Sequence, residues 1–137
     1  TNDVYVTGTR GTILHWTGSQ MVDESIPPSV TVTSIWGVNG NDLWAVAQTG
    51  LIYRKMNNGI WIQQTSPTTQ FLWQIWGTAA DDIWAVGDGA TVIHYDGTQW
   101  STVSVPIAST VSLRGIAPVP GGGLRAVGTS GTVLAHP

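Results

Sequence analysis

A unit of about 40 residues recurs along this 137-residue chain, and such a period restricts the fold more than any other feature of the sequence. The motif Ser34–Gly37, read Ser-Ile-Trp-Gly, returns 40 residues later as Gln74–Gly77, read Gln-Ile-Trp-Gly. A weaker copy stands another 38 residues on, at Ser112–Gly115. The chain is therefore expected to consist of repeated structural units that pack against one another.

Each unit contains up to four short apolar runs of four to six residues, rich in Val, Ile, Thr and Trp and bounded by Gly, Asn, Asp or Pro. This pattern is typical of β-strands. Apolar residues do not recur at helical spacing over three turns anywhere, so essentially no helix is expected. The second run of the unit appears at Asp3–Val6, Asp42–Val46, Asp82–Val86 and Leu124–Gly128, and the third at Gly11–His15, Gly50–Arg54, Ala90–His94 and Gly131–Ala135.

Four antiparallel strands repeated about every 40 residues describe the blade of a β-propeller. The sequence thus predicts an all-β fold of fourteen strands, about three and a half blades, in a single domain or part-propeller that spans 1–137. The units are 1–33, 34–73, 74–111 and 112–137, so the first is expected without its inner strand and the last without its outer strand. Known propellers have roughly 4 to 8 blades. We therefore expect either self-association or a second propeller segment to close the ring; the remaining alternative is that the chain closes alone as a tight four-bladed ring with two incomplete blades.

Composition excludes several classes of protein. Lys and Arg together number 5 against 8 Asp and Glu, a net charge of −3, which disfavours nucleic acid and anionic membranes as partners. No run approaches the roughly 18 apolar residues of a membrane span. Cysteine is absent, and 18 Thr and 10 Ser supply much of the polarity. This profile is typical of exported bacterial proteins and predicts a secreted or cell-surface location.

The best-preserved unit reads Ile75–Gly77, Asp82–Gly87, Val92–Gly97 and then Trp100. This sequence pattern resembles the tryptophan-rich β-propeller repeats found in exported proteins of myxobacteria and other bacteria. It is similar, more distantly, to Asp-box propellers and propeller lectins. The resemblance covers essentially the whole chain and implies the fold, but it is unspecific for activity. The Asp-Gly pair of this unit is replaced by 57–58 (Asn-Asn) in the preceding one, so an Asp-box role is not kept in every blade.

Four tryptophans are candidates for a binding site. Trp61 and Trp100 open the fourth strand of their units and are expected to be partly exposed, where an indole ring can stack on a sugar. Trp16 and Trp73 fall outside the repeat register, and Trp73 belongs to an apolar cluster, Phe71–Trp73, expected in a connection. These two serve a site or an interface, or they pack under a loop. The recurring Trp36, Trp44, Trp76 and Trp84 are expected to fill the wedges between blades.

Polar residues at one repeated position supply the other candidates. His15, Arg54 and His94 occupy equivalent places on the third strand, where they form similar ligand pockets between blades or lie half in water. Asp96, beside His94, is placed to fix a sugar hydroxyl. Three histidines, one to a unit, lack the short ligand spacing of a metal site, and neither a metal nor a cofactor is expected.

No catalytic residues are expected. Glu24 is the only glutamate, no serine stands in a nucleophile-elbow motif, and no glycine-rich phosphate loop precedes a helix. The favoured function is a non-catalytic, lectin-like binding module that takes carbohydrate by aromatic stacking. The alternative is a structural or protein-interaction platform, in which the chain is a fragment or an engineered piece of a longer propeller.

Overall fold

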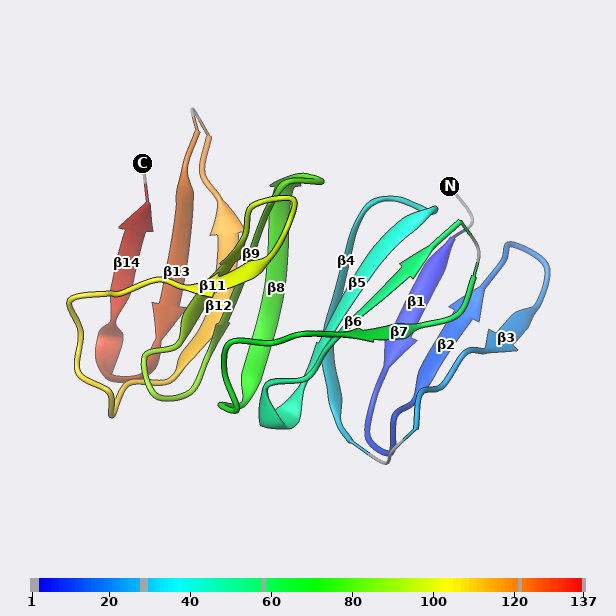
Figure 1. Cartoon of the computed structure of the whole chain (residues 1–137), viewed down its shortest axis with the longest axis horizontal. Helices are drawn as coiled ribbons and strands as arrows, with labels where there is room; N and C mark the ends of the chain where they lie inside the picture. The colour runs from blue at the N-terminus through cyan, green and yellow to red at the C-terminus, as the bar shows by residue number, and fades with distance from the viewer. Residues whose placement is uncertain (1–2, 28–29, 58, 121, 137) are drawn as a thin grey trace.

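The computed structural model describes residues 3–27, 30–57, 59–120 and 122–136, and these form four antiparallel sheets (Figure 1). Within these ranges the only helical segments are two three-residue 3₁₀ turns, η1 (Gln48–Gly50) and η2 (Thr129–Gly131). The expected near absence of helix is confirmed.

The sheets, called blades 1 to 4 here, follow chain order, and each strand pairs with the next one along the chain. Among the described residues the two middle blades have four strands and the outer two have three, as the repeat predicts. Blade 1 has β1 (Val4–Thr7), β2 (Ile13–Trp16) and β3 (Met21–Asp23). Blade 2 has β4 (Val32–Asn39), β5 (Asp42–Ala47), β6 (Ile52–Met56) and β7 (Ile62–Gln64). Blade 3 has β8 (Leu72–Ala79), β9 (Asp82–Gly87), β10 (Val92–Tyr95) and β11 (Trp100–Thr102). Blade 4 has β12 (Leu113–Pro118), β13 (Leu124–Gly128) and β14 (Val133–His136).

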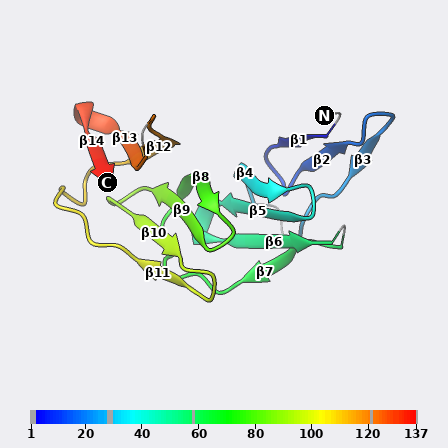
Figure 2. The ribbon, with the colours of Figure 1, turned by 90° about the horizontal axis from the view of Figure 1, so that it is seen from above.

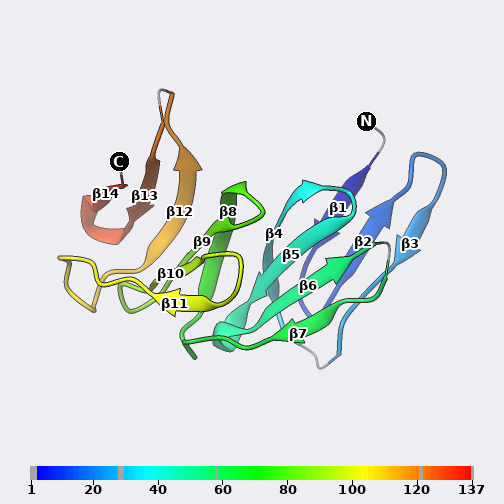
Figure 3. The ribbon, with the colours of Figure 1, turned by 45° about the horizontal axis from the view of Figure 1, so that its top comes forward.

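The blades fan out side by side, with blade 1 and blade 4 at opposite ends (Figures 2 and 3). Their first strands meet along the inner side of the fan, where β4 packs on β8 and β8 on β12. The second strands β5 and β9 are buried along nearly their whole length. A strand covered by a neighbouring blade on both faces needs apolar side chains at every position, which explains the unbroken runs Leu-Trp-Ala-Val and Ile-Trp-Ala-Val.

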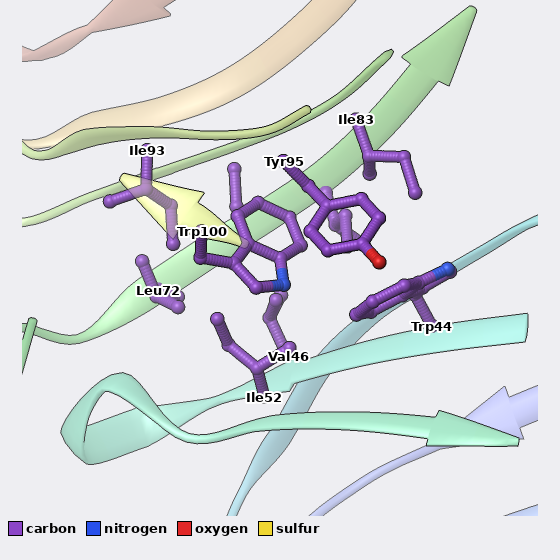
Figure 4. Packing of buried hydrophobic residues seen from close by; sticks show 10 residues of the cluster. Trp44, Val46, Ile52, Leu72, Ile83, Ile93, Tyr95 and Trp100 are labelled. Atoms are coloured by element: carbon purple, nitrogen blue, oxygen red, sulfur yellow. The ribbon is translucent and has the colours of Figure 1, made fainter. Parts of the chain in front are cut away.

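The core consists of three clusters, one between each pair of consecutive blades. Between blades 2 and 3, Trp44, Val46 and Ile52 face Ile83, Ile93, Tyr95 and Trp100 (Figure 4). Trp44 and Trp84 are buried, and Trp36 and Trp76 pack against the same clusters. The expectation that the recurring tryptophans fill the wedges between blades is confirmed.

The structural positions expected for Trp73 and Trp100 are wrong. Leu72 is fully buried and opens β8, so Trp73 belongs to the inner strand of blade 3 and the cluster at Phe71–Trp73 is not a connection. Trp100 is only 8% exposed and stands in the core between blades 2 and 3. A short outer strand still has one face turned toward the neighbouring blade, and in β11 the tryptophan takes that face.

Candidate functional site

A carboxylate at or just before the second strand of blades 1, 2 and 3 pairs with a basic side chain twelve residues later on the third strand. The pairs are Asp3 with His15, Asp42 with Arg54 and Asp82 with His94. The guanidinium of Arg54 donates two parallel hydrogen bonds of 2.9 Å to Asp42, and Nε2 of His94 lies 2.9 Å from Asp82 Oδ1. The three residues predicted to form one ligand site per blade are thus engaged by their own blades.

The same three side chains stack on aromatic rings of the second strand. The ring of His15 lies 4.2 Å from that of Tyr5, the ring of His94 lies 4.2 Å from that of Trp84, and Arg54 stands 4.7 Å above Trp44. Hydrogen bonding to Asp42 raises the pKa of Arg54. This combination of a carboxylate, an aromatic ring and an imidazole or guanidinium group holds each hairpin together, and a ligand role for these residues stays a prediction.

A polar cluster joins blades 1 and 2. The ammonium of Lys55 donates to both oxygens of Glu24 at 2.6 Å, Nε1 of Trp61 donates to Glu24 at 3.3 Å, and Nδ1 of His15 lies 3.0 Å from the same carboxylate. Burial raises the pKa of Glu24, but the hydrogen bonds from Lys55 and His15 outweigh it, so the net shift is downward. A cavity of about 500 Å³ borders Glu24, Lys55 and Trp61. Sequence reasoning found Trp61 and His15 but missed Glu24 and Lys55, which come from different units.

Trp73 occupies a β-bulge of the inner strand, between Leu72 and Gln74. The inner strands of blades 2 and 4 have the same irregularity, which places Thr33 and Arg114 at equivalent positions. Trp73 therefore lies within the repeat register, contrary to expectation, although its residue type is not repeated. The signal available in the sequence was the series Thr33, Trp73 and Arg114, spaced by 40 and 41 residues. The weak copy of the motif expected at Ser112–Gly115 is out of register by three residues, because Gly115 pairs with Val127 as Gln74 pairs with Val86.

An aromatic and basic surface surrounds Trp73. Its ring lies 4.2 Å from that of Phe71, and the guanidinium of Arg114, from β12, stands 4.2 Å above it. Asp88 accepts a 2.7 Å hydrogen bond from the Trp73 indole N–H and another from the hydroxyl of Ser112. The bond from Ser112, followed by that from Trp73, lowers the pKa of Asp88 although burial opposes the shift. We call Phe71, Trp73, Asp88, Ser112 and Arg114 the aromatic–arginine surface.

The aromatic–arginine surface lies where the inner strands of blades 3 and 4 meet. Phe71 and Trp73 are half-buried and Arg114 is exposed. Among the described residues Arg114 takes part in no salt bridge, although its charge contributes to the lowered pKa of Asp88. This surface therefore presents two partly exposed aromatic rings beside an exposed guanidinium.

The remaining candidates lie apart from one another. Asp96 closes the turn before β11, where it accepts hydrogen bonds from the backbone N–H groups of Thr98 and Gln99 at 2.8 and 2.9 Å. Hydrogen bonding, first from the Thr98 hydroxyl, lowers the pKa of Asp96 to about 2. Trp16 is exposed at the end of β2 in blade 1, paired with Met21 of β3. It follows His15 as Tyr95 follows His94 and holds the equivalent place in the hairpin, so it too lies within the repeat register, contrary to expectation.

The described part of the chain contains no group of three or more His, Cys, Asp or Glu side chains able to hold a metal ion. It also contains no helix long and apolar enough to span a membrane.

No family model matches the sequence, and no curated protein matches it. Solved structures, by contrast, do match the fold of this chain. A structure of YCF48 bound to D1 peptide superposes with a TM-score of 0.71 at 14% identity, over 93% of this chain and 44% of that one. YCF48 from Cyanidioschyzon merolae superposes with a TM-score of 0.75 at 14% identity, over 96% of this chain and 50% of that one. YCF48 is a β-propeller. The predicted propeller fold is confirmed. The chain spans about half the length of these neighbours.

Proposed function

We propose that this chain is a non-catalytic β-propeller module that binds a protein partner by holding an extended peptide segment against the aromatic–arginine surface. The observation that carries the proposal is the stack of half-buried Phe71 and Trp73 with exposed Arg114, in which Asp88 accepts a hydrogen bond from the Trp73 indole. One of the structural neighbours is described as bound to a peptide, which supports a protein rather than a sugar as the partner.

The chemistry of the surface suits a peptide. Trp and Arg are among the residues that contribute most to protein–protein binding, because they combine large apolar area with hydrogen bonding. A guanidinium held flat on an indole loses little freedom when it donates to a carbonyl or carboxylate oxygen. The exposed parts of the Phe71 and Trp73 rings would cover an apolar side chain of the segment while Arg114 binds an acceptor beside it.

A selection experiment tests this proposal. A random peptide library displayed on phage is selected on the immobilised chain, and enriched peptides are synthesised and titrated by fluorescence anisotropy. Because each side chain covers a large part of the contact, we expect Trp73→Ala and Arg114→Ala each to weaken binding by at least about tenfold. Ile60→Ala is the matched control, since Ile60 is 77% exposed and lies in blade 2. Failure to enrich any peptide, or equal binding by all variants, would contradict the proposal.

Carbohydrate binding is the alternative, and its support is weaker. Trp100 is buried in the core, and Trp61 is half-buried with its indole N–H on Glu24. Tryptophan quenching by a simple sugar that is lost in Trp61→Ala would favour this alternative over the peptide.

We also propose that the chain associates with copies of itself or with a second propeller segment. Val4 and Val6 on the free face of blade 1, and Val127 and Val133 on the free face of blade 4, are 47 to 63% exposed. The residues at the equivalent positions of blades 2 and 3 are at most 6% exposed, because a neighbouring blade covers them. Apolar blade faces of this kind are stable in water only when covered.

We also propose export to the cell surface or the medium, because Thr and Ser rather than charged residues supply much of the polarity of the chain. The absence of a catalytic function is likewise a proposal, which rests on the sequence having no recognisable set of catalytic residues.

A further inference from the structure

The wedge between blades 2 and 3 is filled on its outer side by three rings. Trp44 comes from the second strand of blade 2, and Tyr95 and Trp100 come from the third and fourth strands of blade 3 (Figure 4). The ring of Trp44 lies 4.7 Å from that of Tyr95 at an angle of 53° and 5.6 Å from that of Trp100. Tyr95 and Trp100 face each other directly across the β10–β11 pair.

Blades 1 and 2 repeat this arrangement. Tyr5 takes the place of Trp44, and Lys55 stands 5.7 Å above its ring in the place of Tyr95. Trp61, at the entry to the fourth strand, packs against the cluster between these blades in the place of Trp100. In both wedges a tryptophan from the fourth strand completes the outer side.

Blades 3 and 4 repeat only two of the three positions. Trp84 and His136 stand 4.7 Å apart at an angle of 51°, nearly the geometry of Trp44 with Tyr95. Blade 4 has three strands among the described residues, and β14 pairs with β13 along one edge only. An apolar cavity of about 380 Å³ opens beside this pair of rings. Its walls include Trp84, Val92, Leu124, Ala126 and Leu134.

We propose that this cavity is a binding site for a large aromatic side chain, preferably tryptophan, carried by an extended peptide segment that adds to β14 as a fourth strand. The segment runs antiparallel alongside Leu134 and Ala135, as β11 runs alongside β10, and its indole lies against Trp84 as Trp100 lies against Trp44. The cavity is within the size range of small-ligand sites, roughly 300 to 1,000 Å³. Backbone hydrogen bonds supply affinity in strand addition, and the pocket supplies selectivity.

This site is separate from the aromatic–arginine surface and does not rest on the proposed function. The cavity walls come from the second and third strands of blades 3 and 4, together with Ile116 and the segment 103–106, which follows β11. None of the five residues of the aromatic–arginine surface lines it. Trp73→Ala therefore leaves the cavity intact, and a variant of the cavity leaves the stack of Phe71, Trp73 and Arg114 intact.

A synthetic peptide that copies residues 99–106, Gln-Trp-Ser-Thr-Val-Ser-Val-Pro, is the probe. Labelled with fluorescein and titrated with the full chain, it is expected to bind saturably. The same peptide with Trp100→Ala is expected to bind at least about tenfold more weakly, because most of the apolar contact is gone. In the protein, Ala126→Phe fills the cavity and is expected to abolish binding, whereas Ala117→Phe, at an exposed alanine of β12, is the control.

A second measurement does not depend on peptide affinity. A copy of residues 96–106 appended after Pro137 is expected to raise the thermal midpoint by at least about 4 °C over the same extension carrying Trp100→Ala. The proposal is overturned by binding that is equal for the two peptides or undiminished by Ala126→Phe. It is equally overturned if the peptide does not bind and the two extended chains melt together.

Discussion

Lys55 is the one charged side chain that is buried in the described part of the chain, at 5% exposure, and Glu24 is its partner across the junction of blades 1 and 2. Removal of one member of a buried ion pair leaves the other without compensation, which costs more than the pair itself contributes. Glu24 also accepts from Trp61 and lies beside His15, so one carboxylate ties together side chains from both blades.

We therefore expect Glu24→Gln to lower the free energy of unfolding by about 3 kcal/mol at neutral pH. The pKa of Glu24 is lowered by folding, so its contribution is complete above the ordinary value of 4.5 and is lost as the pH falls through the folded value. The difference between variant and wild type in urea unfolding should accordingly shrink below about pH 4. Asp81→Asn, an exposed acid-to-amide change, is the control. A difference that persists unchanged in acid would exclude this ion pair as the cause.

At the residue scale the candidate side chains could be identified from the sequence, but the groups that contact them could not. The sequence singled out His15, Arg54 and His94 by their equivalent positions, and the structure shows each joined to a carboxylate twelve residues earlier. That spacing is itself present in the sequence, because a hairpin of fixed register brings the two positions together. Glu24 and Lys55 were out of reach, since their contact depends on how two blades pack.

The inner strands show how a single glycine sets the spacing of two blades. A Cβ atom on Gly77 would come within 2.5 Å of Cη2 of Trp36, whose ring lies flat against the glycine backbone of the next blade. The Trp-Gly motif of the repeat is thus a contact between units as well as a feature of each. The sequence predicted the wedge position of the tryptophan but no role for the glycine that follows it.

Gly77→Ala is expected to destabilise the fold by about 2 kcal/mol, because the added methyl group forces the Trp36 ring out of its place. Denaturant unfolding followed by tryptophan fluorescence measures the change. Gly8→Ala is the matched control, since a Cβ there meets only Thr12 at an ordinary 3.7 Å. We expect it to change stability by no more than about 0.5 kcal/mol. Equal effects of the two substitutions would show that the Trp36 contact is not the cause.

The number and order of strands were predictable from the sequence, because each strand is short, apolar and closed by a turn residue. The start of the inner strand was predicted less accurately. β4 and β8 begin at Val32 and Leu72, two residues before the unit boundaries at 34 and 74, because a bulge lengthens each strand. A bulge leaves no periodic signal in hydrophobicity, and for that reason Trp73 was assigned to a connection.

For the whole molecule, the free face of blade 4 and the free face of blade 1 are equivalent to the two faces that pack against each other between consecutive blades inside the fan. Val46 and Ala85 share the cluster between blades 2 and 3, and their equivalents on the free faces are Val127 and Val6. Association is therefore expected to be head to tail, with the free face of blade 4 on the free face of blade 1.

Sedimentation equilibrium of the 14.5 kDa chain is expected to show a species larger than the monomer. Val127→Lys or Val6→Glu alone should shift it to monomer, because a charge cannot be buried unpaired at the junction. The double variant should regain association, since Lys then faces Glu. If the interface instead joined like faces, the double variant would place Lys against Lys or Glu against Glu and would remain monomeric. A monomeric wild-type chain would overturn the proposal of self-association.

By itself the sequence determined the all-β repeat, the four blades and the strands within them, because strand formation and turn chemistry are local and recur every 40 residues or so. Only the tertiary structure decided which side chains are accessible. In the folded chain Trp100 is buried, Trp73 is half-buried beside exposed Arg114, and a cavity lies beside Trp84 and His136. Accessibility depends on the packing of one blade against the next, and equivalent positions in a repeat differ in their neighbours even where the residues are alike.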